Sequence, residues 1–466
     1  MSVLITIFIT AIIALFTGVF NQGKYARYVG ILGLGIALYV SFLPDCTFFE
    51  KYNAMFSYSA NTALFTKISL VVTLLLFFIA GFAFSNHRSH QSELYALMLF
   101  SLCGGIILFG FQNMVTLFLG IEILSIPLYV MAGSAKTNLR SVEASMKYFL
   151  MGAFATGFLL FGIALIYGST GSFDLATIGA HGATSKMFLL GIVMMLVAMA
   201  FKVSLAPFHM WSPDVYQGAP SLITGFMASV VKIAGFYAFF KVMTLAFIGG
   251  FSMWINIVAV LIILTLILSN IMGLAQTNAK RMLAYSSISH AGYIALIFFG
   301  EIGLSAYNNL ALYVYNLAFY LFAYSLATVG VFMCLIWVEK IKRETSFEAF
   351  NGLAKTEPLL AVVASVSLLS MAGIPLTAGF IGKFNVFSQA ISGNATLLVI
   401  IAILGSALSI AYYLRLIIAM FFYQESTFKT SEKVSITYNI VAVVLVLLLV
   451  AMGVYPDLFA MQFRLY

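Results

Sequence analysis

The sequence contains very little charge. Asp, Glu, Lys and Arg make up 8% of its 466 residues, whereas soluble domains carry roughly 25%. Hydrophobic residues make up 63% of the chain, and the mean hydropathy is +1.07. A soluble globular fold is therefore excluded, and we expect an integral membrane protein.

The residues that usually build metal, cluster and nucleotide sites are also scarce. The sequence has three widely separated cysteines, Cys46, Cys103 and Cys334, so neither a disulfide framework nor iron–sulfur or zinc spacing is present. The five histidines form no H-x-x-x-H pair, and no segment has the G-x-G-x-x-G order of a dinucleotide site. We expect no cofactor or metal bound by this chain.

Apolar runs of the usual ~20-residue length predict about fourteen membrane-spanning helices in an all-α fold. The predicted segments are 3–20, 28–43, 62–84, 93–110, 114–133, 145–168, 187–209, 219–247, 252–275, 283–300, 305–338, 358–392, 395–423 and 434–462. The boundary between 93–110 and 114–133 is weak, because only Gln112 and Asn113 mark it. Polar connections are short throughout, so residues 1–466 are expected to form a single polytopic membrane domain.

Basic residues alternate between the two sides of this arrangement. When the fourteen segments are numbered in chain order, the loops after the odd-numbered ones hold Lys24, Arg27, Arg88, Lys136, Arg140, Lys280, Arg281, Lys340, Lys342, Arg343, Lys355, Lys429 and Lys433. Loops after even-numbered segments, with the C-terminus, hold Lys51, Lys186, Lys241 and Arg464. The positive-inside rule then predicts cytoplasmic odd loops and two termini on the outer side. This asymmetry also accounts for the excess of 23 basic over 15 acidic residues, so no nucleic-acid partner is expected.

The stretch F-K-V-S-L-A-P-F-H-M-W-S-P-D-V-Y-Q-G-A-P-S, residues 201–221, places a lysine beside an interrupted helix. Lys202 follows a long apolar run, and a lysine at mid-bilayer costs at least ~2.5–3.5 kcal/mol on insertion scales. Pro207 removes a backbone donor and breaks the helix; His209 and Asp214 follow it. A buried cation at a helix break indicates an ion pathway, because freed backbone at membrane depth is tolerated only inside protein or beside a water-filled cavity.

Glu122 lies in the middle of a predicted span, in L-F-L-G-I-E-I-L-S-I-P. A lone buried carboxylate is costly, so we expect a cationic partner, and Lys202 and Lys232 are the candidates. A pair that opens and closes would change the proton affinity of the lysine, as a proton pump requires. A static pair that fixes helix packing is the alternative.

The stretch A-G-I-P-L-T-A-G-F-I-G-K-F, residues 372–384, predicts a second broken helix. Its glycines and Pro375 loosen the backbone, and Lys383 follows in an apolar setting. Two interrupted helices, each with a lysine and one in each half of the chain, are typical of inverted-repeat transporters.

Four further groups of residues carry buried or partly buried charge. Lys232 lies about two and a half turns into its predicted span, too deep to reach the interface easily. His290, in A-Y-S-S-I-S-H-A-G-Y, suits either a proton relay or a packing role. Glu143 and Lys147 are spaced i, i+4 and predict a surface salt bridge or a proton entrance. Arg415 either guards an exit or holds a carbonyl group.

These motifs resemble the subunit N family of bacterial NADH–quinone oxidoreductase, the antiporter-like subunit of respiratory complex I that corresponds to mitochondrial subunit 2. The resemblance extends over about residues 112–389 and is carried by L-F-L-G-I-E, E-A-S-M-K-Y-F, the 201–220 stretch, A-K-R-M-L-A-Y-S-S-I-S-H-A-G-Y and G-I-P-L-T-A-G-F-I-G-K-F. The ending P-D-V-Y-Q-G-A-P is specific for it, because sister subunits L and M and the Mrp-type cation/proton antiporters differ there.

The resemblance implies two inverted five-helix repeats. The implied divisions are about 1–92 for the N-terminal helices, 93–247 and 252–423 for the repeats, and 434–466 for the C-terminal helix. It also implies a proton pathway through Glu122, Lys202, Lys232, His290 and Lys383, from the cytoplasm to the periplasm. Glu143, Lys147, His209, Asp214 and Arg415 are secondary candidates.

At the level of the complex, the resemblance implies a proton-translocating enzyme in the bacterial inner membrane. FMN, iron–sulfur clusters and quinone would belong to other subunits, and the expected partners are subunits M, A, J and K and the lipid bilayer. Two alternatives remain: an autonomous Mrp-type sodium/proton antiporter, and a scaffold subunit that transports nothing.

Overall fold

The computed structural model describes residues 1–20, 22–43, 53–84, 91–181, 185–300, 310–424, 434–457 and 459. These residues form helices joined by short connections, and the only β-structure among them is three isolated bridges. The prediction of an all-α membrane protein is confirmed.

Each predicted segment contains at least one helix. The helices are α1 (Ser2–Val19), α2 (Ala26–Val40), α3 (Ala60–Ala83), α4 (Gln91–Gly110), α5 (Met114–Ala132), α6 (Leu139–Thr170), α7 (Leu175–Ala180), α8 (Lys186–Val203), α9 (Trp211–Gly218), α10 (Ser221–Phe226), α11 (Lys232–Lys241), α12 (Phe251–Leu274), α13 (Ala279–Ala295), α14 (Leu310–Lys342), α15 (Leu353–Thr356), α16 (Pro358–Ala372), α17 (Ala378–Ser392), α18 (Thr396–Phe422) and α19 (Ile436–Val454). Within the described ranges, twelve helical segments are long and apolar enough to cross a membrane, and α16 is a shorter apolar helix.

Polar side chains at the ends of the apolar runs set where several helices begin. Asn113 accepts a hydrogen bond from the backbone of Thr116 and starts α5, and Ser185 accepts one from Phe188 and starts α8. Such caps satisfy backbone donors that have no partner inside the helix. The weak boundary expected at Gln112 and Asn113 is therefore a true helix start.

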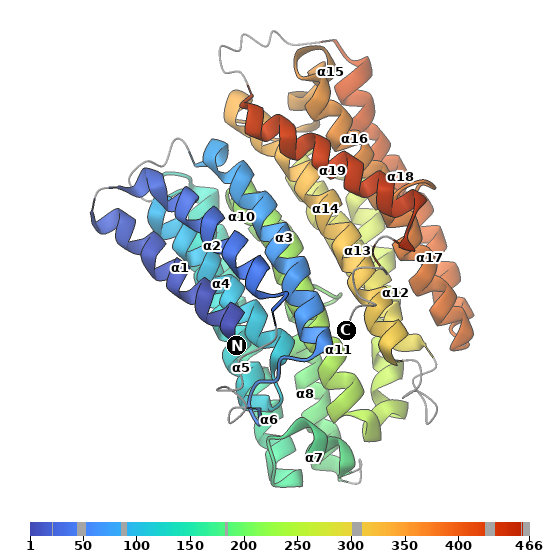
Figure 1. The fold of residues 1–466 in the computed structure, drawn as a ribbon. Helices are drawn as coiled ribbons and strands as arrows, with labels where there is room; N and C mark the ends of the chain where they lie inside the picture. Colours follow the sequence, from blue (N-terminus) through green and yellow to red (C-terminus); the bar gives the residue numbers. More distant parts are fainter. Residues whose placement is uncertain are drawn as a thin grey trace. The chain divides into compact units, whose positions relative to one another are not determined.

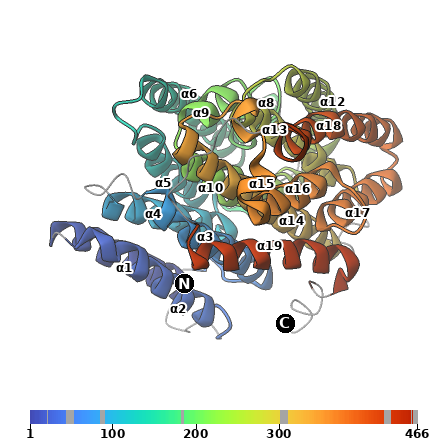
Figure 2. The same cartoon turned by 90° about the horizontal axis from the view of Figure 1, so that it is seen from above.

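The chain divides into two compact units. The first comprises Met1–Leu74, His87–Ala219 and Val230–Leu261, and the second comprises Leu75–Asn86, Pro220–Ser229 and Ile262–Tyr466. In the first unit, α1 lies against α2 and α4, and α6 packs against α8 (Figure 1). In the second, α16 packs against α14, α18 and α19 (Figure 2).

Burial is uneven among the spans. The most apolar 18 residues of the segment Ser221–Ala246, which contains α10 and α11, are all buried inside the protein, whereas those of α1 are only 28% buried. The α13 and α14 segments are each 94% buried. Most residues in the apolar parts of these three segments, the polar ones included, are thus covered by protein.

Two lysines lie deeper than the sequence indicated. Lys241 and Lys280, counted above as loop residues, are 8% and 2% exposed. A charge at the end of an apolar run can fold back under a neighbouring connection, and hydropathy does not distinguish that from an exposed position.

Candidate functional site

The break predicted around Pro207 is present in the first unit. α8 ends at Val203 because Ser204 adopts a left-handed conformation with φ 65°, and six non-helical residues separate Ser204 from α9. The indole Nε1 of Trp211 donates a 3.1 Å hydrogen bond to the Phe201 carbonyl across the break. This places Lys202 in the last turn of α8, where the helix dipole favours a cation.

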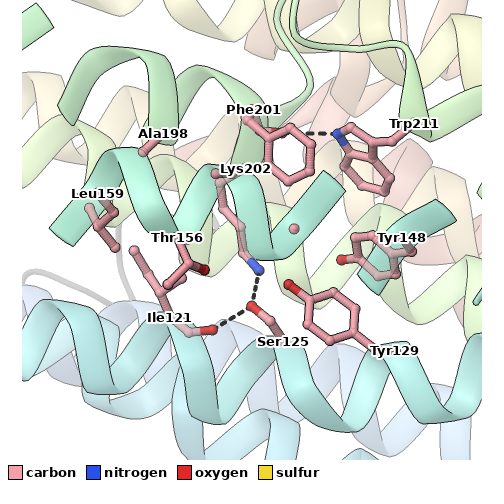
Figure 3. Close-up of a pocket in the computed structure, with 12 residues that line it drawn as sticks. Ile121, Ser125, Tyr129, Tyr148, Thr156, Leu159, Ala198, Phe201, Lys202 and Trp211 are labelled. Atoms are coloured by element: carbon pink, nitrogen blue, oxygen red, sulfur yellow. Dashed lines mark hydrogen bonds between the residues drawn. The ribbon is translucent and has the colours of Figure 1, made fainter. Parts of the chain in front are cut away.

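The Lys202 ammonium donates a 2.6 Å hydrogen bond to the Ser125 hydroxyl of α5 (Figure 3). Ser125 in turn donates to the Ile121 carbonyl, and the Tyr129 hydroxyl also interacts with Ser125. These groups face a pocket of about 20 Å³, counted as the space open to the centre of a water molecule. That volume accommodates about one water, so the lysine has both a fixed partner and room for a mobile one.

Aromatic rings form much of the wall of this pocket. Tyr148 stacks on Trp211 with ring centres 4.7 Å apart, and Tyr129 meets Tyr148 edge to face at 4.7 Å. Large rigid rings thus line the pocket, and the polar edges of two of them are bonded, Trp211 to the Phe201 carbonyl and Tyr129 to Ser125.

Glu122 lies one turn before Ser125 on α5 and accepts a 2.7 Å hydrogen bond from the Thr156 hydroxyl of α6. It is close enough to Lys202 for an electrostatic interaction, but within the described part of the chain no ion pair joins the two. Each of the two groups instead binds a hydroxyl, Glu122 that of Thr156 and Lys202 that of Ser125.

Glu143, Lys147 and Asp214 form an ionic cluster in the first unit. Lys147 lies 2.7 Å from Glu143 on the same helix, as the i, i+4 spacing predicts, and 2.7 Å from Asp214 on α9. The side chain of Glu143 is 61% exposed, that of Lys147 is 40% exposed and that of Asp214 is 35% exposed. The cluster joins α6 to the helix after the break and is open to the surroundings.

His209 lies inside the break and is buried. Its Nδ1 atom has no hydrogen-bond partner among the described residues. Buried polar atoms are nearly always hydrogen-bonded, so this nitrogen is an exception within the break.

Lys232 begins α11, directly after a π-helical turn at Met227–Val231, and is 3% exposed. One turn later, a Cβ atom added to Gly235 would lie 3.6 Å from Cγ of Lys202. The two predicted lysines therefore lie on helices that pack together within the first unit.

The second unit contains the other break. α16 ends at Gly373, whose φ of 85° is left-handed, and α17 begins at Ala378. Lys383 on α17 reaches back to donate to the Ala372 carbonyl at 2.9 Å and to the Ser406 hydroxyl at 2.8 Å. A cation at the C-terminal end of α16 satisfies a carbonyl that has no partner in the helix.

His290 lies among tyrosines in the same unit. Its Nδ1 is 3.0 Å from the Tyr320 hydroxyl, its Nε2 is 3.4 Å from the Tyr413 hydroxyl, and its ring centre is 4.7 Å from that of Tyr324. Both ring nitrogens of His290 thus meet hydroxyl groups that can donate and accept, an arrangement that suits a relay and a packing role alike.

Two tyrosines link His290 to Lys383. Tyr293, edge to face with His290, has its ring 4.8 Å from the Lys383 ammonium. Tyr320 packs against Gly382, the residue before Lys383. The structure thus brings the two predicted residues of the second unit into one aromatic and polar cluster.

Arg415 lies apart from this cluster. Its guanidinium donates a 2.8 Å hydrogen bond to the Leu274 carbonyl and lies 4.9 Å from the Phe347 ring. Of its two expected roles, the structure shows the carbonyl contact.

Sequence reasoning missed the hydroxyl partners of the charged groups: Ser125, Thr156, Ser406, Tyr320 and Tyr413. Only Ser125 had a usable signal, because its i+3 spacing places it beside Glu122 on one helix. The others lie on distant helices, and their contacts depend on tertiary packing.

A family model described as NADH:quinone oxidoreductase/Mrp antiporter, TM, matches residues 111–409. NADH-quinone oxidoreductase subunit N of Cytophaga hutchinsonii is 42% identical over 92% of this chain and 91% of its own. The protein of the same description from Flavobacterium psychrophilum is 38% identical over 98% and 99%. A chain in the structure of respiratory complex I from Thermus thermophilus with bound aureothin matches with a TM-score of 0.79 and 32% identity over 98% of both chains.

Proposed function

The chain belongs to the NADH:quinone oxidoreductase/Mrp antiporter family, and we propose that it works as a proton-translocating membrane subunit of a bacterial NADH-quinone oxidoreductase. It is a multi-pass membrane protein whose curated relatives are subunits N of that enzyme. We place it in the inner membrane with both termini on the periplasmic side, following the distribution of basic loops.

The arrangement around Lys202 carries this proposal. A lysine at a helix break holds one hydroxyl partner, faces a pocket for about one water, and has Glu122 nearby but not in contact. An approaching carboxylate stabilises the ammonium form of a lysine, and a receding one favours loss of the proton. Movement of Glu122 between Thr156 and Lys202 would therefore load and release a proton.

The proposed route begins at the exposed Glu143–Lys147–Asp214 cluster and passes His209 to Lys202 and Lys232. It continues through His290 and Lys383 to the outer side. Each of these residues is an acid or base able to accept and return a proton. In this chain no redox step occurs; the quinone, flavin and iron–sulfur chemistry that drives the cycle belongs to partner subunits, among which we expect subunits M, A, J and K.

Substitution of Lys202 or Glu122 tests the proposal. We expect Lys202→Ala and Glu122→Ala each to lower proton pumping and the coupled quinone reduction together, by at least about tenfold, because each removes a proton-transferring group. Pumping is measured by a pH-sensitive dye in membrane vesicles energised with NADH. Lys136→Ala, in an exposed loop, is the matched control. Normal pumping in both variants, with the assembled complex at its usual level, would refute the assigned roles.

The family description also includes Mrp antiporters, so an autonomous sodium/proton antiporter is the second candidate. Gentle extraction of the tagged protein from its native membrane separates the two. A large assembly with flavin and iron–sulfur absorbance and NADH–quinone activity supports the redox pump. A small colourless protein that exchanges sodium for protons in vesicles supports the antiporter.

A further inference from the structure

Lys241 is a buried cation that the proposed route does not use. It is the last residue of α11 and is 8% exposed. Its ammonium donates a hydrogen bond to the Phe111 carbonyl and lies 4.6 Å from the centre of the Phe111 ring. Both contacts are with one residue, in the short connection between α4 and α5.

This connection is a tightly bonded junction in the first unit. Phe111 forms an antiparallel bridge with Phe56, and Asn113 forms one with Asp174. The backbone of Gln112 donates to the Met55 carbonyl at 3.0 Å, so three separate stretches of chain meet at this connection. The Lys241 ammonium binds this junction through the Phe111 carbonyl.

No carboxylate within the described ranges forms an ion pair with Lys241. Asp174, which belongs to the same junction, uses its carboxylate to accept hydrogen bonds of 2.9 Å from the backbone and hydroxyl of Thr177 at the start of α7. Among the described residues, the positive charge of Lys241 therefore meets a carbonyl dipole and an aromatic face.

A neutral side chain would bond the Phe111 carbonyl at lower cost. Buried charges are normally paired, because removing an ion from water is far more costly than removing an amide. An unneutralised lysine inside a membrane protein is thus expected to serve through its charge.

We propose that Lys241 is an electrostatic barrier that stops protons from returning through the first unit. It lies nine residues beyond Lys232 on one helix, about 14 Å along the axis at 1.5 Å per residue. The predicted topology puts this end of α11 on the outer side. A fixed positive charge between the outer side and Lys232 repels protons and hydronium, as cationic residues do in water-selective pores. The inference rests on the proposed function, since it assigns Lys241 to the same pathway.

The test measures passive proton leak in vesicles that contain the assembled complex, with an imposed pH gradient and no NADH. Lys241→Gln keeps a donor for the Phe111 carbonyl but removes the charge, Lys241→Met removes both, and Lys241→Arg keeps both. The repulsion between two unit charges about 14 Å apart, in a medium of effective dielectric constant ~20, slows proton passage about sevenfold. We expect the Gln and Met variants to leak about sevenfold faster and the Arg variant to match the wild type, with exposed Lys186→Gln as control.

Two outcomes would contradict the proposal that Lys241 is an electrostatic barrier. A leak in Lys241→Met but not in Lys241→Gln would show that Lys241 only supports the junction, and unchanged leak in both would show no role in proton retention. Assembly on a native gel verifies that each variant is folded. Because the leak is measured without NADH, its result is separate from the Lys202→Ala pumping test, and either proposal can fail alone.

Discussion

The lysines of the two breaks each bond a serine rather than an acid. Lys202 bonds Ser125 and Lys383 bonds Ser406. A hydroxyl both donates and accepts, so it serves as partner to a lysine in either protonation state. A fixed carboxylate contact would instead hold the proton in place, which fits a static pair better than a relay.

Loss of the Ser125 hydroxyl is expected to slow pumping. Ser125→Ala removes a hydrogen bond to a charged group, which is worth about 1.5–3 kcal/mol, and frees Lys202 to move away from the pocket. We expect proton pumping to fall about tenfold or more in NADH-energised vesicles while the complex still assembles. Ser125→Thr keeps the hydroxyl and is the matched control. Wild-type pumping in Ser125→Ala would show that this contact does not position Lys202.

At the scale of elements, the two broken helices place their lysines differently. Lys202 belongs to the half-helix that precedes its break, whereas Lys383 belongs to the one that follows and reaches back to Ala372. The prolines and glycines predicted both breaks, because they remove donors or permit left-handed backbone. The sequence could not show that the Lys383 ammonium lies at the C-terminal end of α16, since that depends on how α17 packs back against α16.

Gly373 offers a test of the second break. Its φ of 85° disfavours any side chain, and an added Cβ would lie 3.0 Å from Cδ of Lys383. We expect Gly373→Ala to lower the free energy of unfolding by about 1–2 kcal/mol and to reduce pumping by displacing Lys383. Thermal unfolding of the purified complex and vesicle pumping measure the two effects.

The control for that substitution is Gly157→Ala in α6. A Cβ there meets nothing within 4 Å, and alanine improves helix propensity by up to ~1 kcal/mol. Gly157→Ala should therefore leave both readings unchanged or slightly raise stability. Equal losses in the two variants would mean that the left-handed conformation at Gly373 has no special importance.

At the scale of the whole molecule, composition and hydropathy sufficed for the fold class and the approximate helix positions. Composition and hydropathy did not predict that charged residues at helix ends are buried. Lys280 was expected in a loop, yet it is buried and lies 3.1 Å from Glu339, whose other oxygen accepts a hydrogen bond from Ser221. That contact joins the starts of α10 and α13 to the end of α14, and no single apolar run contains information about it.

The predicted topology can be checked by labelling single cysteines from each side of the membrane. In a Cys46→Ser background, we expect Lys136→Cys to react with an impermeant maleimide only from the cytoplasmic side and Lys186→Cys only from the outer side. Both positions are exposed, and the native Cys103 and Cys334 are buried. Labelling of both variants from one side, or the reverse pattern, would contradict the topology.

The two bonds of Lys383 have a consequence for how its proton can leave. An ammonium has three N–H groups, and two of them are engaged by Ala372 and Ser406. A neutral amine keeps two N–H groups, so both bonds survive when the third proton departs, and the nitrogen gains a lone pair directed away from them. In the proposed pathway, Lys383 would thus alternate between acid and base without changing its rotamer, and the same atom would serve as an anchor and as a carrier.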